Sequence, residues 1–473
     1  MSDKLTMPIR AQPFDHQRRA FNTAVGTFKS GKSRGYTLLM EMGCGKSLTA
    51  VGIAGRLYLD GSIRRVLVVA PLSIVGVWDE EFQKFAAFDY TLAVLNGSGA
   101  KKAETLRKLN GSGLQVAVVN YESAWRMEKE IAAWNPDLII ADEGHKIKTH
   151  NISASKAMHR LGARSAYRLL LTGTVITNKA IDVFSQYKFL NPAVFGNSFY
   201  TFRNRYFDMV GYGNHTPVLK KAMADELTRR LHSIAFRATK AECLDLPATT
   251  DIIRSVELEP AAMKVYRDLV KESYAELGEK EITAANILTR LLRLSQLTGG
   301  FIGDDEGGAP QNISRAKLNA LSDILDMAAQ EGRKLVIIAR FVAEIKAICA
   351  MLGKMGIGYS LIMGGVTDRE EQVSRFQNDP DVQVFVGQIA TAGLGITLTA
   401  ASTLVFYSTD YSMSNHEQAR ARIHRVGQRE NCTYIYLAAK GTVDMKVLKA
   451  LRDKADLART LVDDYRSGRN PYQ

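Results

Sequence analysis

The residues with the clearest chemical meaning are a lysine and a serine that follow two closely spaced glycines. The run MGCGKS at 42–47 follows a predicted strand and opens a predicted helix. Such glycines let backbone N–H groups turn toward a phosphate, and the helix N-terminus adds positive potential. Lys46 could then reach the β- and γ-phosphates of a nucleotide, and the Ser47 hydroxyl could hold Mg²⁺. The full GxxxxGK[ST] pattern requires glycine at position 40, where this chain has Met40, so a tight turn without a ligand remains an alternative.

A second feature is an acidic pair at the end of the apolar run LIIAD, 138–142. The carboxyl end of a parallel strand is where open α/β sheets bind ligands. Asp142 could hold Mg²⁺ through water, and Glu143 could polarise an attacking water. An isolated pair of this kind is also consistent with a solvated strand end. Together with the glycine-lysine run upstream, it favours hydrolysis of a nucleoside triphosphate.

A third feature lies in the second half of the chain, in QARARIHRVGQ at 418–428. Arg422 and Arg425 are three residues apart, so on a helix they would share one face. Arginines brought to a γ-phosphate stabilise charge in the transition state and contribute about 10³–10⁵ in rate. Without that context, basic residues on a helix are also consistent with a solvated face or a stripe that contacts DNA.

The elements that must position these residues are short β-branched runs, each followed by a turn and a helical stretch. Continuous apolar strands that alternate with helices are typical of parallel sheets covered on both faces. Two such sets occur, at 36–40, 66–70, 116–120, 138–142 and 168–172, and then at 335–339, 382–386, 403–407 and 433–438.

Between the two sets, the sequence contains few strand runs and more helical ones. We therefore expect an α/β protein with an N-terminal lobe at 1–190, a helical region at 191–312 and a C-terminal lobe at 313–473. The stretch 303–312 is rich in glycine and acidic residues, which predicts a linker or exposed loop.

Composition narrows the class of protein. The chain has 473 residues, 46% hydrophobic and 23% charged, which is ordinary globular usage. The net charge is +13 with a pI near 9.4, which favours a polyanionic partner such as nucleic acid, although charge for solubility alone is an alternative. No apolar run approaches the roughly 18 residues of a membrane span, and the N-terminus lacks a secretory signal. The four cysteines are far apart and form no CxxC, so we expect no zinc site, no disulfide framework and a reducing compartment.

At this point the residues match a known family. The chain resembles the SNF2 branch of the superfamily 2 helicases over nearly its whole length. In the first half, PFDHQ (13–17) resembles the adenine-reading Q motif, EMGCGKS motif I, VLVVAPLSIVGVW (66–78) motif Ia, VVNYES (118–123) motif Ib, DEGH motif II and LLLTGTVITN (169–178) motif III. In the second half, KLVIIARF (334–341) resembles motif IV, AGLGITLTAASTLVFY (392–407) motif V and QARARIHRVGQ motif VI, the most specific match. The segments FLNPAVFG (189–196) and FRATK (236–240) are similar to those that flank the helical protrusions of SNF2 proteins.

The resemblance implies two RecA-like lobes in tandem, a helical insertion, and the cofactors ATP and Mg²⁺. It assigns nucleotide contacts to Phe14 and Gln17 on the base, to Gly43, Cys44, Gly45, Lys46 and Ser47 on the phosphates, and to Gly393, Gly395 and Gln418 in the second lobe. The resemblance assigns catalysis to Lys46, Asp142, Glu143, Arg422 and Arg425. It assigns Mg²⁺ binding to Ser47 and Asp142. Coupling between hydrolysis and movement falls to His145, Thr172, Gly173, Thr174 and His424.

By the same motif positions, the resemblance predicts DNA contacts. The candidates are Pro71, Leu72, Asn120, Tyr121, Arg237, Lys240, Arg340, Phe341, Gln388 and Thr391. Packing or ordinary surface charge remains an alternative for each of them. The chain also departs from the family pattern: Ala390 stands where many members have Arg, Val175 and Thr177 replace Pro and Gln in motif III, and RATK replaces RRTK.

The function that the resemblance implies is an ATP-driven motor that tracks along double-stranded DNA with little sequence specificity and marked salt dependence. A strand-separating or branch-migrating helicase and an RNA motor remain alternatives, whereas a non-catalytic clamp predicts loss of the lysine, the acidic pair or the arginines, all of which are present. We expect a monomer without membrane association in a bacterial or phage-infected cytoplasm. Recombination, repair, replication restart, transcription clearance and anti-defence would all use this engine.

Overall fold

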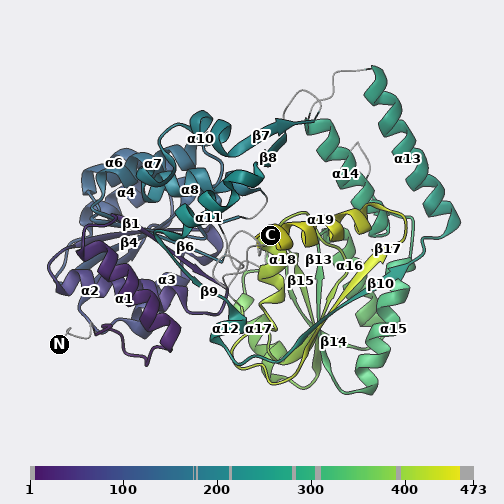
Figure 1. Cartoon of the computed structure of the whole chain (residues 1–473). Coiled ribbons are helices and arrows are strands. Elements are labelled where there is room, and N and C mark those ends of the chain that lie inside the picture. The colour runs from purple at the N-terminus through teal and green to yellow at the C-terminus, as the bar shows by residue number, and fades with distance from the viewer. Residues whose placement is uncertain are drawn as a thin grey trace. The chain divides into compact units, whose positions relative to one another are not determined.

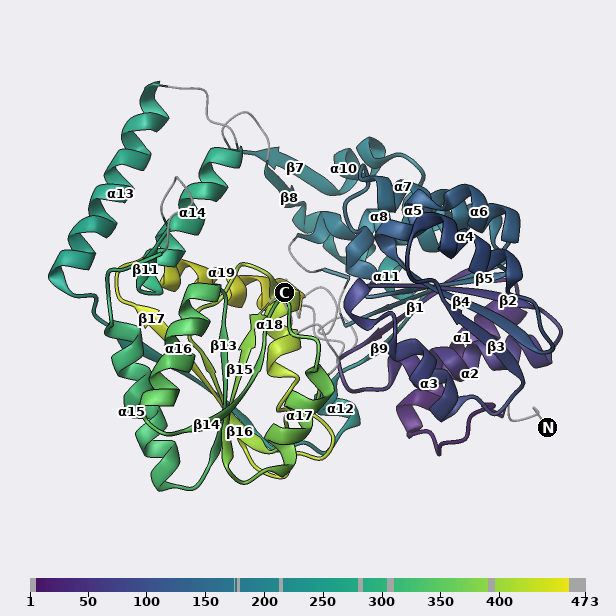
Figure 2. The same ribbon diagram turned by 180° about the vertical axis from the view of Figure 1, so that it is seen from behind.

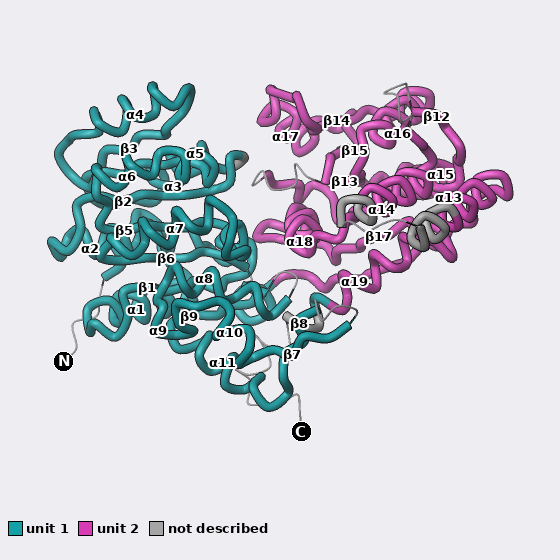
Figure 3. The backbone as a smooth tube through the Cα atoms, turned by 90° about the horizontal axis from the view of Figure 1, so that it is seen from above, with its two compact units in different colours: residues 1–245, 454–473 teal, residues 246–453 magenta. Residues whose placement is uncertain are grey.

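The computed structural model describes residues 6–173, 175–176, 179–211, 216–279, 284–303, 310–389 and 396–458. It divides the chain into two compact units, Met1–Asp245 with Lys454–Gln473, and Leu246–Asp453 (Figure 3). Each unit is described by itself.

The first unit is built on a seven-stranded sheet in which every pair of neighbours is parallel. Its central strands are apolar and almost entirely buried, as a sheet covered on both faces requires. In spatial order, the strands are β3 (Tyr90–Val94), β4 (Leu114–Asn120), β2 (Arg65–Ala70), β5 (Leu138–Asp142), β6 (Tyr167–Thr172), β1 (Gly35–Met40) and β9 (Ala235–Ala238).

Helices cover both faces of this sheet (Figures 1 and 2). One face carries α1 (Asp15–Lys29), α2 (Lys46–Leu59) and α3 (Val77–Phe85). The other carries α4 (Gly99–Lys108), α5 (Tyr121–Arg126), α6 (Glu128–Trp134), α7 (Ser153–Arg164) and α8 (Val183–Leu190). The unit continues through α9 (Pro192–Phe195), α10 (Phe199–Tyr206), an antiparallel hairpin of β7 (Phe207–Val210) and β8 (Thr216–Leu219), α11 (Ala224–His232) and α12 (Lys240–Cys243).

The second unit is built on a six-stranded sheet, again parallel throughout. In spatial order, its strands are β10 (Thr249–Val256), β17 (Cys432–Ala439), β16 (Ala401–Phe406), β13 (Lys334–Ala339), β15 (Val382–Gln388) and β14 (Gly358–Ile362). Figure 2 shows α15 (Ala316–Gln330) and α16 (Val342–Lys354) on one face, and α17 (Arg369–Asn378) and α18 (Met413–Arg420) on the other. The remaining elements are the helix pair α13 (Pro260–Glu279) and α14 (Ala284–Thr298), the short hairpin of β11 (Phe301–Ile302) and β12 (Gln311–Asn312), and α19 (Val443–Ala458).

The predicted fold class is confirmed, because both units are parallel sheets flanked by helices. All nine strands expected from apolar runs are present, and the segment 303–312 mostly falls outside the described residues. The compact units differ from the three expected regions: residues 191–245 belong to the first unit and 246–312 to the second. The difference arises because β9 and β10, both within the expected helical region, pair with β1 and β17 at the edges of the two sheets.

The register of the first sheet brings the loops that follow its strands together at the carboxyl ends of the strands. Leu39 of β1 is paired with Thr172 of β6 on one side and with Arg237 of β9 on the other, and Asp142 of β5 is paired with Leu171. The loops that follow these four strands therefore leave the sheet next to one another. Among the described residues, no helix has both the length and the apolar character that crossing a bilayer requires.

Candidate functional site

The loop between β1 and α2 has the form of an anion cradle. Gly43 and Gly45 have φ angles of +89° and +83°, which side chains other than glycine rarely adopt. A Cβ on Gly45 would lie 2.1 Å from Nε2 of Gln17, so a larger residue there would have to displace the Gln17 side chain. Gly45 caps the 14-residue helix α2 without a side-chain hydrogen bond. The first N–H groups of α2 therefore remain available to a bound anion.

Lys46 and Ser47 begin α2, where a phosphate would contact them. Both are half-buried, and the Lys46 ammonium donates to the carbonyl of Met40 at 3.0 Å. This bond folds the lysine back across the loop, so its charge lies over the cradle. The roles of the two residues in binding phosphate and Mg²⁺ stay a prediction.

The start of α1 is fastened to the same loop. Gln17 is buried, donates from Nε2 to the carbonyl of Cys44 at 3.2 Å, and accepts from the N–H of Phe14 at 2.9 Å. Nε2 of His16 lies 2.9 Å from the same carbonyl of Cys44. Burial raises the pKa of the Cys44 thiol to about 12, so this side chain packs as a small apolar group.

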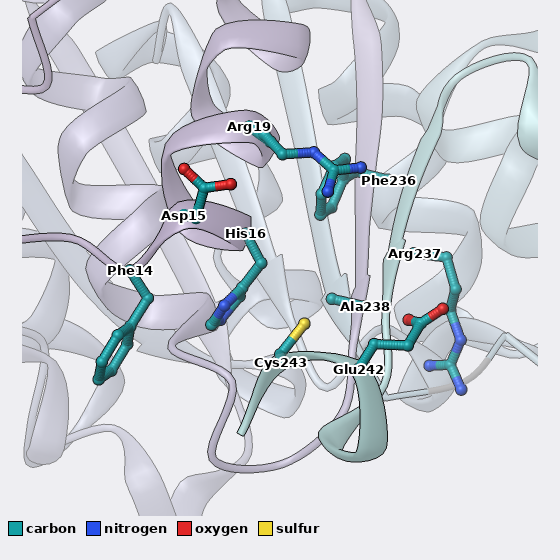
Figure 4. A pocket seen from close by; sticks show the side chains of 9 residues that line it. All are labelled: Phe14, Asp15, His16, Arg19, Phe236, Arg237, Ala238, Glu242 and Cys243. Carbon is teal, nitrogen blue, oxygen red and sulfur yellow. The ribbon is translucent and has the colours of Figure 1, made fainter. Parts of the chain in front are cut away.

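A pocket of about 310 Å³ opens beside this contact (Figure 4). Its walls come from the start of α1 and from β9 with α12. Phe14 is 54% exposed there, and the guanidinium of Arg19 lies 5.8 Å from the ring centre of Phe236. An aromatic side chain and a guanidinium are groups on which a planar base can stack. The lining residues are Phe14, Asp15, His16, Arg19, Phe236, Arg237, Ala238, Glu242 and Cys243.

Asp142 is held in place from three directions at the end of β5. Its Oδ2 accepts from Nε1 of Trp78 at 3.1 Å, its Oδ1 from the N–H of Glu143 at 2.9 Å, and its carbonyl from the hydroxyl of Tyr121 at 2.7 Å. Burial, and then the negative charge of Glu143, raise the pKa of Asp142 to about 7, against the opposing charge of Lys46. A carboxylate in this position gains most from a nearby cation.

Glu143 adopts a backbone conformation that is rare for its residue type. Its φ is +50°, in the left-handed region. Nδ1 of His145 lies 3.2 Å from Oε2 of Glu143, and both side chains are largely buried. The turn and the contact with His145 therefore fix the direction of the Glu143 carboxylate. His145 is one of the residues predicted to couple hydrolysis to movement. Such strain is common where a residue's position is set by its function.

The segment after β6 completes this edge of the sheet. Thr172 is buried at the end of the strand, and the carbonyl of Gly173 accepts from Nη1 of Arg237 at 2.8 Å. Thr174, also predicted to act in coupling, lies outside the described residues.

In the second unit, the structure corrects the expectation that Arg422 and Arg425 share a helix face. Helix α18 ends at Arg420, and both arginines lie in the turns that follow. They nevertheless converge, because Nη1 of each donates to the carbonyl of Ile396, at 3.3 and 3.2 Å. Gln418 lies within α18, where its Nε2 donates to Oγ of Ser414 at 3.4 Å.

A residue that the sequence did not single out fixes these turns. Gln428 is buried, and its Nε2 donates to the carbonyls of Ala401 at 2.8 Å and Ile423 at 3.2 Å, with Thr399 at 3.4 Å. Its Oε1 accepts from the next two backbone N–H groups at 2.9 and 3.0 Å. Its place at the end of the QARARIHRVGQ motif was the only signal in the sequence. His424, a predicted coupling residue, has Nε2 at 2.9 Å from the carbonyl of Pro247 in the same unit.

The residues predicted to contact DNA fall into three groups. Those of the first group either have accessible side chains or stabilise a loop through hydrogen bonds or stacking. Leu72 is 75% exposed after Pro71, which precedes a short 3-10 turn. The Asn120 side chain caps α5 by accepting from the N–H of Ser123 at 2.8 Å. In the second unit, the guanidinium of Arg340 stacks 4.9 Å from the ring centre of Phe341, and Nε2 of Gln388 donates to the carbonyl of Arg340 at 3.3 Å.

For Tyr121 and Arg237, which form the second group, the structure corrects the predicted DNA contact. Tyr121 is 8% exposed and its hydroxyl is bonded to the backbone of Asp142. Arg237 is 7% exposed and its guanidinium is bonded within the unit. Lys240 opens α12, where its N–H donates to Glu41 at 3.0 Å. In the third group, Thr391 lies outside the described residues, as do the nucleotide candidates Gly393 and Gly395.

The donor set fits a nucleotide with Mg²⁺. Mg²⁺ is usually held by one or two protein oxygens together with phosphates and waters. Ser47 and Asp142 supply such oxygens, beside a cradle of N–H groups and a lysine. Among the described residues, no group of three or more His, Cys, Asp or Glu forms a separate metal cluster. The structure thus brings Lys46, Ser47, Asp142 and Glu143 to one edge of the first unit, and Gln418, Arg422 and Arg425 to one region of the second.

Comparisons with known proteins agree with this pattern. The family model of the SNF2-related domain matches residues 16–299, and that of the helicase conserved C-terminal domain matches 316–427. An uncharacterized ATP-dependent helicase of Mycoplasma pneumoniae is 27% identical over 444 aligned positions, which cover 91% of this chain and 40% of that protein. A DNA repair and recombination protein RAD54-like of Drosophila yakuba is 26% identical over 488 positions, which cover 93% of this chain and 61% of that protein. The chain thus spans less than two thirds of each of these relatives.

One solved structure is also similar. It is a Sulfolobus solfataricus SWI2/SNF2 ATPase core in complex with dsDNA, which is 26% identical with a TM-score of 0.47. The match covers 98% of this chain and 95% of that chain.

Proposed function

Because the chain belongs to the SNF2-related family of superfamily 2 helicases, we propose that it is a DNA-stimulated ATPase that moves along duplex DNA. The observation that carries this proposal is the convergence of Lys46, Ser47, Asp142 and Glu143 at the carboxyl edge of one parallel sheet. No single motif is sufficient, but an anion cradle beside a buried acidic pair is the combination that phosphoryl transfer needs.

Each group at this edge has a separate part in the reaction. The N–H groups at the start of α2 and the Lys46 ammonium would bind the phosphates, and the pocket lined by Phe14 would accept the base. Ser47 and Asp142 would hold Mg²⁺, which would supply positive charge to neutralise the phosphates. Glu143 orients and polarises the attacking water, and His145 keeps its carboxylate aimed.

Two arginines from the second unit complete the reaction. Arg422 and Arg425 act on the charge that develops at the γ-phosphate, which is where such residues have their largest effect on rate. Their shared bond to Ile396 holds the two guanidinium groups together before a nucleotide arrives. Loss of a bound γ-phosphate is a local change that drives alternation between two states in other nucleotide switches, and we propose the same for this protein.

Duplex DNA is the proposed track, gripped through its phosphates. The net charge of +13 supports a polyanionic partner, and a relative named for DNA repair and recombination supports DNA. Leu72, Asn120, Arg340, Phe341 and Gln388 are the described side chains that we assign to this contact. Because backbone contacts read no bases, affinity should fall steeply with salt and vary little with sequence. We also propose that the protein works as a monomer in a bacterial or phage-infected cytoplasm.

The test is steady-state ATP turnover, measured separately without nucleic acid, with single-stranded DNA, with duplex DNA and with RNA. The wild type should be stimulated most by duplex DNA, and Lys46→Ala and Glu143→Gln should each abolish the stimulated rate. The matched controls are Lys108→Ala and Glu122→Gln, whose side chains are 74% and 67% exposed in surface ion pairs. Turnover that persists in both site variants contradicts the site.

Strand separation is distinguished from movement along duplex DNA by two further assays on the same protein. Displacement of a triplex-forming strand without unwinding of a forked duplex supports the proposal. Unwinding of the fork at a comparable rate would instead identify a strand-separating helicase.

A further inference from the structure

Arg237 connects two chain segments, the end of β1 with the first residue of the phosphate loop and the residue after β6, at the end of the sheet where the nucleotide is proposed to bind. It lies in the edge strand β9, directly opposite Leu39 of β1. Its Nη1 donates to the carbonyl of Gly173 at 2.8 Å and to that of Leu39 at 3.3 Å, and its Nη2 donates to Oε1 of Glu41 at 2.9 Å. The guanidinium therefore spans the end of β1, the segment after β6 and the first residue of the phosphate loop.

Glu41 extends this connection in two directions. Its carbonyl accepts from the N–H of Cys44 at 3.1 Å, inside the phosphate loop. Its N–H donates to the carbonyl of Ala238 at 3.0 Å, and its Oε2 accepts from the N–H of Lys240 at 3.0 Å, where α12 begins. One carboxylate thus joins the phosphate loop to the last helix of the first unit, shortly before the chain leaves that unit at Asp245.

The chemistry of the guanidinium suits a fixed spacer. Arginine presents its donors in a rigid planar fork, so several bonds from one group set distances as well as energy. The Arg237 side chain is 6% exposed and its charge is balanced by Glu41, which is 34% exposed. A lysine in the same place would offer the three donors of one ammonium nitrogen, without the fixed spacing of the guanidinium fork.

We propose that Arg237 is a positioning residue that sets the phosphate loop against Gly173, directly after β6. The inference rests on the proposed ATPase function. In the proposed function the nucleotide is bound chiefly by the N–H groups of α2 and by Lys46, whereas the hydrogen bonds of Arg237 described above go to Leu39, Gly173 and Glu41. The alignment of the loop with the segment after β6 does depend on Arg237. Its loss should therefore lower kcat and leave the KM for ATP nearly unchanged.

The experiment compares Arg237→Met and Arg237→Lys with a matched control, Arg168→Met. Arg168 lies at the opposite end of β6, is equally buried at 7% exposed, and donates from Nη1 to the carbonyl of Gly162 at 2.6 Å. We expect Arg237→Met to lower duplex-stimulated kcat about 10- to 100-fold, the range of a misplacement near 1 Å, with the KM for ATP changed less than about threefold. Arg237→Lys should retain an intermediate kcat, and Arg168→Met should keep the wild-type kcat even where it lowers the Tm.

Three outcomes overturn the inference. The first is a kcat for Arg237→Met equal to that of Arg168→Met. The second is a rise in KM with kcat unchanged, which would make Arg237 a binding residue. The third is a loss of duplex affinity with a shallower salt dependence, which would restore the DNA contact expected from the sequence.

The proposed function and this inference fail in different ways. If the wild type hydrolyses no ATP with any nucleic acid, the proposed function is wrong, and the positioning role is then read from amide hydrogen exchange. Arg237→Met should raise exchange in the peptide covering 41–48 more than Arg168→Met does. Equal exchange in the two variants overturns the positioning role independently of catalysis.

Discussion

Replacing Gln428 by methionine tests whether hydrogen bonds, and not helical spacing, hold the two arginines of the second unit. Methionine keeps the length of the side chain and removes its polar atoms. The two N–H bonds of Nε2 to the carbonyls of Ala401 and Ile423 are lost, as are the two bonds that Oε1 accepts. The packing contribution is largely preserved, so the measured change reports the hydrogen bonds.

The magnitude follows from these four bonds. At about 1 kcal/mol each, they contribute roughly 4 kcal/mol to the free energy of unfolding of the second unit. Arg429 and Glu430 are exposed, so their N–H groups regain water, whereas Ala401 and Ile423 are buried and their carbonyls do not. We therefore expect a loss of about 2–4 kcal/mol.

The assay must separate the two units. The three tryptophans, Trp78, Trp125 and Trp134, all lie in the first unit, so tryptophan fluorescence follows that unit alone. Hydrogen exchange read peptide by peptide should rise across 396–439 in Gln428→Met and stay unchanged across 66–142. Duplex-stimulated turnover should fall as well, because Arg422 and Arg425 lie in the loosened turns.

Gln418→Met is the matched control. Gln418 is half-buried, and its Nε2 makes a single long bond, to Ser414 at 3.4 Å. Its replacement should change stability by less than about 0.5 kcal/mol. Through its proposed contact with the nucleotide, it should still weaken ATP binding. If Gln428→Met destabilises the second unit no more than Gln418→Met, the account of these turns is refuted.

Two further predictions concern Asp142 and its partner Tyr121. The pKa of Asp142 is raised from 3.8 to about 7, so the folded protein keeps a proton that the unfolded chain releases. The experiment is done with EDTA and without nucleotide. The contribution of this group to the free energy of unfolding is then complete below a pH of about 4 and is lost as the pH rises to about 7. Asp142→Asn should flatten this dependence in thermal melts while abolishing turnover, and an unchanged pH profile would show that another group titrates. Tyr121→Phe should lower the free energy of unfolding by about 1 kcal/mol through one lost hydrogen bond, with duplex affinity unchanged in a binding titration. A clear loss of duplex affinity would return Tyr121 to the DNA contacts.

The sequence was sufficient for the centres of both sheets but not for their edges. A central parallel strand is buried on both faces, so its apolar run is visible in the sequence, as in LIIAD and VLVVA. The edge strand β10 reads TTDIIRSV and is mostly exposed, so it shows no such run. The edge strand β9 carries Arg237 within four residues. Both were assigned to a helical region, and the difference in domain boundaries follows from this.

The phosphate loop and the acidic pair could be predicted because their geometry is local. Two glycines, a lysine and a helix start lie within six residues, and Asp142 and Glu143 are adjacent. The pKa of Asp142 could not be predicted, because the burial that raises it depends on the packing of the whole sheet, and Trp78, which bonds the carboxylate, is 64 residues away. The sequence therefore predicts contacts between neighbouring residues, but not properties that depend on the packing of distant segments.

Burial then divides the motif residues by the kind of role they can have. Gln17, Gln428 and Arg237 carry the polar groups that motif reading assigns most readily to ligands, yet each is at most 8% exposed and bonded to backbone within its own unit. A ligand could recruit such a group only by breaking bonds already made, at a cost of about 1–3 kcal/mol for each buried partner left unsatisfied. Lys46 has a different position, because it is half-buried and its ammonium donates to the carbonyl of Met40, the last residue of β1. Lys46 should therefore meet a nucleotide directly, whereas Gln17, Gln428 and Arg237 should act by holding neighbouring groups in place.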